Sequence, residues 1–235
     1  MKKTMLICCL MFTSLLAWAQ QPSSEEGQNR EWLTSFTAVE VTAPLDIKFV
    51  RVPDTEAPRI LYDTKGSTTS RFRAEVRNKV LYISERYDSR RIERTSVTVY
   101  YNTLERLAIA DAVATFEEGI SATLLDMTVG GTARVTASLD VKDLKMEQTG
   151  KSSVTLSGDV RYLSLYVSNG TFTAPDLEVM AAEVNVTGSG SASLWVTDRF
   201  EGKTSTGGKI VYKGDPTVVR RDLKFMGGDI LHTEE

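Results

Sequence analysis

The chain has 235 residues, 41% of them hydrophobic, and a formal net charge of −3 at pH 7. This length suits one large domain. The acidic balance lacks the basic footprint of a nucleic-acid-binding protein, so no nucleic-acid partner is expected.

The first residues have the three parts of a secretory signal peptide. Lys2 and Lys3 precede an apolar run over residues 5–17, and Ala17-Trp-Ala19 supplies the small residues that a signal peptidase reads. The run is too short to span a bilayer permanently. We therefore predict that residues 1–19 are removed and that the protein is exported from a Gram-negative-type cell, to the periplasm or the outer surface.

Cleavage there would also remove both cysteines of the chain, Cys8 and Cys9. The mature protein would then have no disulfide and no thiol chemistry, so its stability must come from packing. No later segment is apolar enough to cross a membrane. Residues 20–35 begin with a stretch that has no apolar side chain except Pro22, which predicts a disordered leader.

Residues 36–103 form a β-rich but irregular segment. Alternation of apolar and polar residues predicts strands, as in Phe36-Thr-Ala-Val39-Glu-Val41 and Val97-Thr-Val99-Tyr-Tyr101. Residues 85–94 are mostly charged and predict an exposed loop. The segment is either a set of irregular early coils or a β-cap that closes one end of a stack.

Residues 104–213 repeat with a period of about nineteen residues. The repeats are anchored by residues that mostly tolerate positive φ at a turn: Asp111, Gly131, Gly150, Asn169, Gly188 and Gly207. Around each anchor apolar residues alternate with the period of a strand, which predicts three short strands and two corners per repeat. Residues 214–235 are expected to cap the other end or form a tail.

Such strands are too short to bury a face alone, so successive repeats must stack as the coils of a solenoid. We predict an all-β fold, a right-handed parallel β-helix, with Val135, Val154, Ala192 and Val211 in one inner column. A slip of one residue at Thr173 would turn Phe172 and Ala174 inward as a bulge. A β-sandwich is the alternative, but its strands do not keep one spacing and one set of inner residues over six units.

Several segments in this order resemble the putative auto-transporter adhesin family, also called the head GIN domain. They are the opening Phe36-Thr-Ala-Val39-Glu-Val41 strand, Leu81-Tyr-Ile83, Leu104-Glu-Arg-Leu107, the Gly-punctuated repeats and the closing Ile210-Val-Tyr212-Lys-Gly214-Asp-Pro216. The resemblance covers nearly all of the mature chain, and Ala110-Asp111-Ala112 departs from it at one turn. It implies export, a β-helical fold and a surface-binding role, and it supplies no catalytic residues.

Residues that could carry catalysis are scarce. His232 is the only histidine, it lies near the C-terminus, and no nucleophile elbow is present, so a Ser-His-Asp site is not expected. One histidine and no mature cysteine leave no zinc ligand set, and we predict no cofactor. Acid pairs such as Asp140 with Asp143 could serve a polysaccharide-active enzyme, a lyase or hydrolase, which is the alternative function.

Outward positions of the repeats suggest a ligand face instead. They predict a flat, hydroxyl-rich sheet that carries an aromatic ring, with Trp195 exposed on another face. The candidate residues are Thr149, Tyr166, Ser168, Asn185, Thr187 and Trp195. The structural alternative is that Thr and Ser simply favour exposed strands.

We therefore expect an exported, non-enzymatic binding or structural module, adhesin-like, that recognises a glycan or another cell-envelope component through a solenoid face. The sequence does not specify the oligomeric state.

Overall fold

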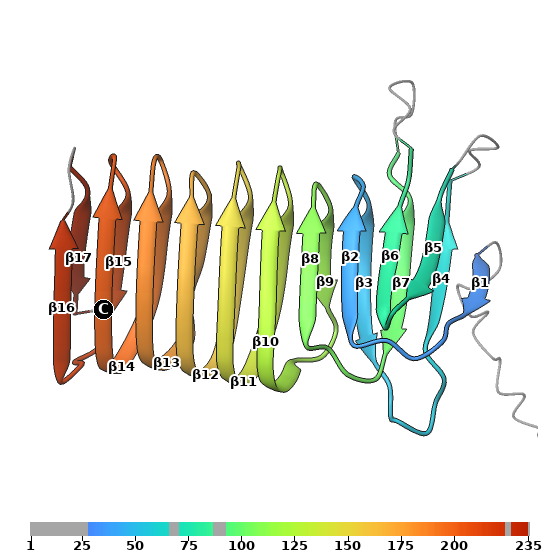
Figure 1. Ribbon diagram of the computed structural model, residues 1–235, viewed down its shortest axis with the longest axis horizontal. Helices are drawn as coiled ribbons and strands as arrows, with labels where there is room; N and C mark the ends of the chain where they lie inside the picture. The colour runs from blue at the N-terminus through green and yellow to red at the C-terminus, as the bar shows by residue number, and fades with distance from the viewer. Residues whose placement is uncertain (1–27, 66–70, 87–92, 224–226, 235) are drawn as a thin grey trace, which may run out of the picture.

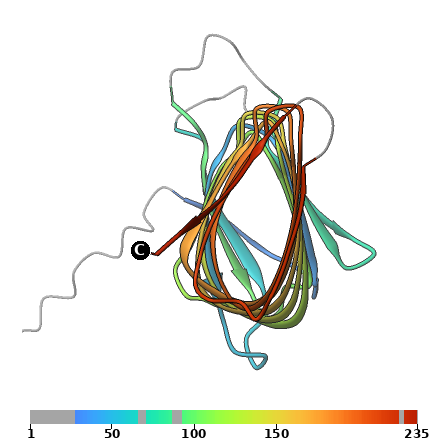
Figure 2. The ribbon, with the colours of Figure 1, turned by 90° about the vertical axis from the view of Figure 1, so that its left-hand side faces the viewer.

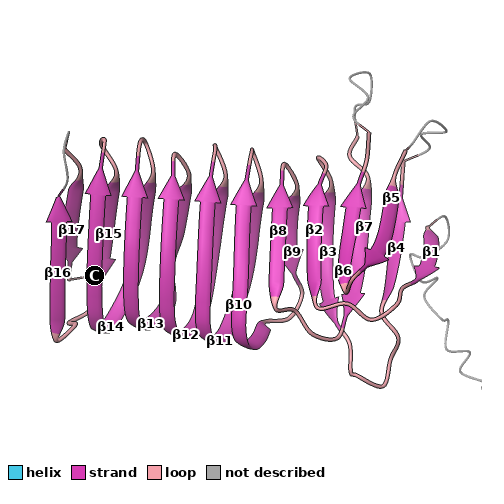
Figure 3. Ribbon diagram, viewed as in Figure 1, coloured by secondary structure: helices cyan, strands magenta, loops and turns pink. Residues whose placement is uncertain are grey.

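The structure, a computed structural model, describes residues 28–65, 71–86, 93–223 and 227–234. The predicted signal peptide and residues 20–27 of the predicted leader lie outside these ranges. Every regular element of the described residues is a β-strand (Figure 3). None of them forms a helix of the length and hydropathy needed to cross a membrane.

The strands wind into a β-solenoid of about 7 turns, with a spacing of about 19 residues per turn. Seen end-on, each coil is a flattened ring with two long sides (Figure 2). We call the side facing the viewer in Figure 1 the front sheet and the opposite side the back sheet. The chain rises in the front sheet, descends in the back sheet and advances from right to left, so the winding is right-handed (Figure 1).

Strands β10 to β14 build the regular coils. They span Ile120–Gly130, Arg134–Thr149, Ser153–Ser168, Thr171–Thr187 and Ser191–Ser205. Each bends at one corner, as at Lys142 and Asp143, where two successive side chains point outward between buried Val141 and Leu144. The first part of each strand therefore lies in the back sheet and the second in the front sheet. Each of these coils has two long sides, and the expected third strand is absent because the chain bends at the corner within one continuous strand.

Equivalent residues of successive coils lie directly above one another. Val135 pairs with Val154, and all of the apolar side chains of this column are buried. The column continues through Phe172, Ala192 and Ile210. The predicted inward turn of Phe172 and Ala174 is confirmed, and the register shifts just after Thr155, where its partner strand passes through Ala174 and Pro175. Proline suits such an irregularity because it has no N–H to donate to the ladder.

The predicted place of Val211 in that column is wrong. Val211 pairs with Ser193 and is only half-buried, while its neighbour Ile210 is fully buried. The prediction assumed a constant spacing of about nineteen residues, but Ala192 and its partner Ile210 are one residue closer than that. A shift of one residue turns every inward side chain of the strand outward, and every outward one inward.

The turns that join the two sheets use positive φ. Asp111, Gly131, Gly150 and Asn169 have φ of 62°, 63°, 71° and 64°. Asp111 thus takes the same backbone conformation as the glycines, although the turn sequence Ala110-Asp111-Ala112 departs from the family pattern. Its Oδ1 accepts a hydrogen bond from the backbone N–H of Thr132 at 2.8 Å, and Asn169 Oδ1 accepts one from Ser189 at 3.0 Å. These two side chains therefore tie neighbouring turns together, as turn-forming Asx residues do within one turn.

The N-terminal segment contributes two coils, whose order in space differs from their order in the chain. β2 and β3 (Ala38–Thr42, Asp46–Arg51) lie between β6 and β7 (Val80–Ser84, Ser96–Tyr101) on one side and β8 and β9 (Arg106–Ala110, Val113–Phe116) on the other. The chain therefore forms β2 and β3 first and then β6 and β7, which lie nearer the N-terminal end of the stack. It then crosses back to form β8 and β9 on the other side of β2 and β3 (Figure 1).

Antiparallel strands cover the outer edges of this end. β5 (Arg73–Arg77) pairs with β6 through a two-residue turn, Asn78-Lys79, in which both residues have positive φ. Such a turn fits the twist of a β-hairpin. β4 (Arg59–Asp63) pairs with β7, and β1 (Asn29–Trp32) pairs with β4. The segment therefore contains both coils and a cap.

β1 falls in residues 20–35, which we expected to be disordered, and that expectation is wrong for Asn29–Trp32. All four of its residues are exposed, so no core explains the strand. It forms because β4 offers an unpaired edge, and backbone hydrogen bonds to that edge do not depend on apolar side chains.

The C-terminal residues continue the solenoid and do not fold as a separate cap. β15 (Lys209–Lys213), β16 (Val218–Leu223) and β17 (Asp229–Thr233) stack in parallel on the coil below, β16 in the front sheet and β17 in the back sheet. His232 belongs to β17, where its ring stacks on Tyr212 with ring centroids 4.9 Å apart. It is therefore an ordered part of the last coil.

Candidate functional site

The front sheet brings five of the six predicted ligand residues together. Thr149, Ser168 and Thr187 lie directly opposite one another on β11, β12 and β13. Two residues earlier on the same strands, Tyr166 pairs with Asn185, and the Tyr166 hydroxyl lies 3.5 Å from Thr187 Oγ1. The five side chains point outward because they alternate with buried residues such as Val167 and Val186.

Trp195 lies on the back sheet, away from the other five residues. It pairs with Glu178 on one side and Lys213 on the other, and the Lys213 ammonium stands 5.3 Å from the ring centroid. The predicted outward direction on another face is therefore the one observed. The ring is only partly accessible.

The front sheet has a second exposed aromatic ring that the sequence reasoning missed. Tyr162 is 50% exposed, more than Tyr166 at 38%. Both lie on β12, and the alternation that places Tyr166 outward reaches back to Tyr162 through Ser164. Following the outward positions back from Tyr166 through Ser164 would have predicted that Tyr162 is exposed.

A hollow of about 290 Å³ opens beside Tyr162. Its floor is made by small side chains, Ser164 and Ala181, which face outward between larger neighbours. Asp143 and Arg199 stand at its two ends, because the register pairs Asp143 with Tyr162 and Ala181 with Arg199. This volume is at the lower end of the range for ligand pockets, and it offers room for one sugar ring.

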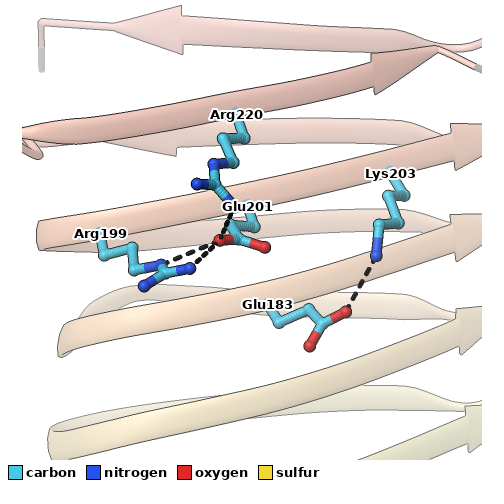
Figure 4. A network of polar contacts seen from close by, with 5 residues as sticks. All are labelled: Glu183, Arg199, Glu201, Lys203 and Arg220. Carbon is cyan, nitrogen blue, oxygen red and sulfur yellow. Dashed lines mark hydrogen bonds and ion pairs between the residues drawn. The ribbon is translucent and has the colours of Figure 1, made fainter.

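Ion pairs order the charged rim of this hollow (Figure 4). Glu201 Oε1 accepts hydrogen bonds from Arg199 Nε at 2.9 Å and from Arg220 at 3.3 Å. Lys203 Nζ donates to Glu183 Oε1 at 3.0 Å. The hydrogen bond from Arg199 holds the pKa of Glu201 below its usual value, and the bond to Glu183 raises the pKa of Lys203. Glu201 and Lys203 therefore stay charged at neutral pH.

The back sheet carries an acid ladder, Asp140, Asp159 and Glu178, in which each residue is directly opposite the next. Asp140 and Asp143, considered above as a pair, lie on opposite sides of the corner, in the back and front sheets. No group of three His, Cys, Asp or Glu residues in the described part of the chain is placed to hold a metal ion. His232 Nε2 is hydrogen-bonded to the Gly214 carbonyl at 2.7 Å.

Several solved structures have the same architecture. A putative adhesin from Bacteroides fragilis is 20% identical, with a TM-score of 0.79 over 88% of this chain and 96% of that one. A putative lipid binding protein from Parabacteroides distasonis is 16% identical, with a TM-score of 0.66 over 88% and 96%. A putative adhesin from Parabacteroides merdae is 16% identical, with a TM-score of 0.65 over 88% and 95%. At these identities the likeness shows the fold.

A search of curated proteins finds no match to the chain. The family model described as "putative auto-transporter adhesin, head GIN domain" matches residues 35–216. That range runs from just before β2 to the end of the loop after β15, and so it contains the regular coils and most of the N-terminal cap. The chain belongs to the putative auto-transporter adhesin, head GIN domain family.

Proposed function

We propose that this protein is an exported, non-enzymatic, adhesin-like module that binds a glycan of the cell envelope or its surroundings through the front sheet. The observation that carries the proposal is the pair of exposed rings, Tyr162 and Tyr166, on a flat polar sheet beside a hollow of about 290 Å³. Aromatic rings bury the apolar face of a sugar, and neighbouring hydroxyl, amide and carboxylate groups pair with its hydroxyls.

Screening the exported protein on a glycan array tests this proposal. Binding to at least one glycan is expected, with the signal lost in Tyr162→Ala and weakened in Tyr166→Ala. Trp195→Ala is the matched control, because that ring lies on the back sheet beneath Lys213. Absence of any glycan signal, or equal binding by all four proteins, would refute the proposal.

A lipid arm belongs in the same experiment, since one protein of similar fold is named a putative lipid binding protein. The exported protein is offered to phospholipid vesicles under the conditions of the array. Glycan binding without vesicle binding supports the proposal. Vesicle binding with no glycan bound contradicts it.

The alternative function, a polysaccharide lyase or hydrolase, has one favouring observation, the acid ladder of Asp140, Asp159 and Glu178. Carboxylates on neighbouring strands about 5 Å apart could act as an acid and a nucleophile. Incubation with neutral and uronate polysaccharides discriminates between the two functions. New reducing ends or unsaturated products that disappear in Asp159→Asn would favour the enzyme.

A further inference from the structure

One line of outward side chains follows the corner edge of the front sheet, parallel to the long axis of the solenoid. The register places its members directly opposite one another in successive coils. In order they are Leu124, Asp143, Tyr162, Ala181, Arg199 and Val218. Leu124 is 55% exposed and Tyr162 50% exposed, so two large side chains with accessible apolar surface flank Asp143.

Two hollows adjoin this line. The one beside Tyr162 is lined by Asp143, and a second hollow of about 700 Å³ is lined by Leu124 and Lys142. Because Leu124 pairs with Asp143, the two hollows meet at neighbouring residues of adjacent strands. The second hollow also extends around the corner, since its lining includes Ser121 and Asp140, which pair in the back sheet.

The spacing along the line fits an extended polymer. Adjacent coils are separated by about 4.8 Å, so Leu124 and Tyr162, two coils apart, are separated by about 10 Å. That distance is comparable to the length of two sugar units in an extended chain. One unit could lie on Tyr162 and the next but one on Leu124, with Asp143 accepting hydroxyl hydrogen bonds between them.

Charges along the line favour a ligand without net charge. The Asp143 side chain makes no hydrogen bond or ion pair with any other residue in the described part of the chain, so its carboxylate is open to a ligand's hydroxyls. Residues 140–145 carry two basic side chains, Lys142 and Lys145, and two acidic ones, Asp140 and Asp143, so the charges of this stretch are balanced. A binding site for a polyanion would show an excess of basic side chains.

The basic residues at the other end of the line are already engaged. Arg199 and Arg220 bind Glu201, and Lys203 binds Glu183. An anionic sugar would have to replace these carboxylates, whereas a neutral sugar leaves all three ion pairs intact.

We infer that the line from Leu124 to Ala181 is a track for an extended, neutral glycan chain that runs parallel to the solenoid axis. The inference rests on the proposed function, because it specifies the ligand class and the direction of binding at the same sheet. It places Leu124 in the binding site, although this residue is five coils from Val218 at the other end of the line and has no polar side-chain group.

Titration calorimetry with oligosaccharides of defined length tests the inference. The probes are neutral cello-, xylo-, manno- and laminari-oligosaccharides of one to six units, with oligogalacturonate of matched lengths as the anionic series. We expect one neutral series to bind, with affinity rising at least tenfold from one unit to four and little beyond six, and the anionic series to bind more weakly.

Variants separate the track from the single hollow. Leu124→Ala should reduce the affinity for four units about tenfold and leave the affinity for one unit unchanged, whereas Tyr162→Ala should reduce both. Both side chains are exposed, so circular dichroism and melting temperatures matching the unchanged protein are the expected folding control. Trp195→Ala should bind normally.

Each contrary outcome has its own meaning. Length-independent binding, a silent Leu124→Ala, or preference for the anionic series overturns the track while the proposed function stands. Failure of every oligosaccharide and of every glycan on the array overturns the proposed function itself, and the track with it.

Discussion

Val154 and Thr155 are consecutive residues of β12 whose side chains meet opposite environments. Val154 is fully buried beneath Val135, while Thr155 is exposed on the back sheet. We predict that Val154→Asp unfolds the protein, because it removes roughly 1.5–3 kcal/mol of apolar burial and also buries an unpaired charge. Thr155→Asp should change the free energy of unfolding by less than about 0.5 kcal/mol.

Urea denaturation followed by circular dichroism measures both variants. Equal loss of stability in the two would contradict the assigned directions of these side chains.

Tyr101 predicts how stability changes at alkaline pH. Burial raises the pKa of Tyr101 to about 12, and the ring packs edge-on against Phe49. The unfolded chain loses the phenol proton near pH 10, while the folded protein keeps it to about pH 12. The contribution of the Tyr101 phenol to the free energy of unfolding is therefore complete below pH 10 and is lost as the pH rises towards 12.

Thermal melting between pH 8 and 12 measures this loss. Tyr101→Phe should melt at a temperature that falls less steeply above pH 10. Some slope should remain, because burial also raises the pKa of Tyr62. An unchanged slope in Tyr101→Phe would contradict the assignment.

At the scale of elements, β16 and β17 end the stack with one edge that no other described strand covers. Arg221 takes an inward position here, directly opposite Gly202, and its guanidinium binds the Tyr212 hydroxyl. His232 stacks on the same ring. A charge at an inward position is a known means of preventing strand edges from pairing with other chains.

Arg221→Val is therefore expected to promote association of two copies through their last coils. Size-exclusion chromatography with light scattering should show a larger mass that increases with protein concentration. Arg220→Val changes an outward residue of the same strand and is the control. The prediction fails if both variants keep the mass of the unchanged protein.

The elements also show what the sequence could and could not predict. Coils from β10 onward were predictable because each pairs with the next about nineteen residues on, so period and pairing coincide. The insertion of β2 and β3 between two later coils was not, since pairing over such separations leaves no constant spacing. β1 escaped prediction because its stability comes from backbone pairing with β4.

The candidate site was also only partly predictable from the sequence. Tyr166, Asn185 and the hydroxyl ladder followed from alternation along the repeats. The hollow did not, because it depends on Ala181 and Ser164 being smaller than their neighbours in adjacent coils. The ion pairs of Glu201 depend on side chains from two coils, Arg199 and Arg220, and a single repeat does not reveal them.

At the scale of the whole molecule, the solenoid is a rigid rod with two unlike sides. The front sheet carries two exposed tyrosines beside a hollow of about 290 Å³. The back sheet carries an acid ladder beside a hollow of about 380 Å³ and a partly accessible tryptophan with a lysine over its ring. A rod of this kind holds its outward side chains at a fixed repeat along its length. The account therefore predicts that ligand contact is confined to one side.

Hydroxyl-radical footprinting of the protein without residues 1–19, with and without a saturating neutral oligosaccharide from the binding series, tests this most directly. The method oxidises exposed tyrosine and tryptophan side chains, so Tyr162, Tyr166 and Trp195 report on both sheets in one experiment. We predict slower oxidation of Tyr162 and Tyr166 with ligand and an unchanged rate at Trp195. Protection of Trp195 with both tyrosines unprotected would contradict the account.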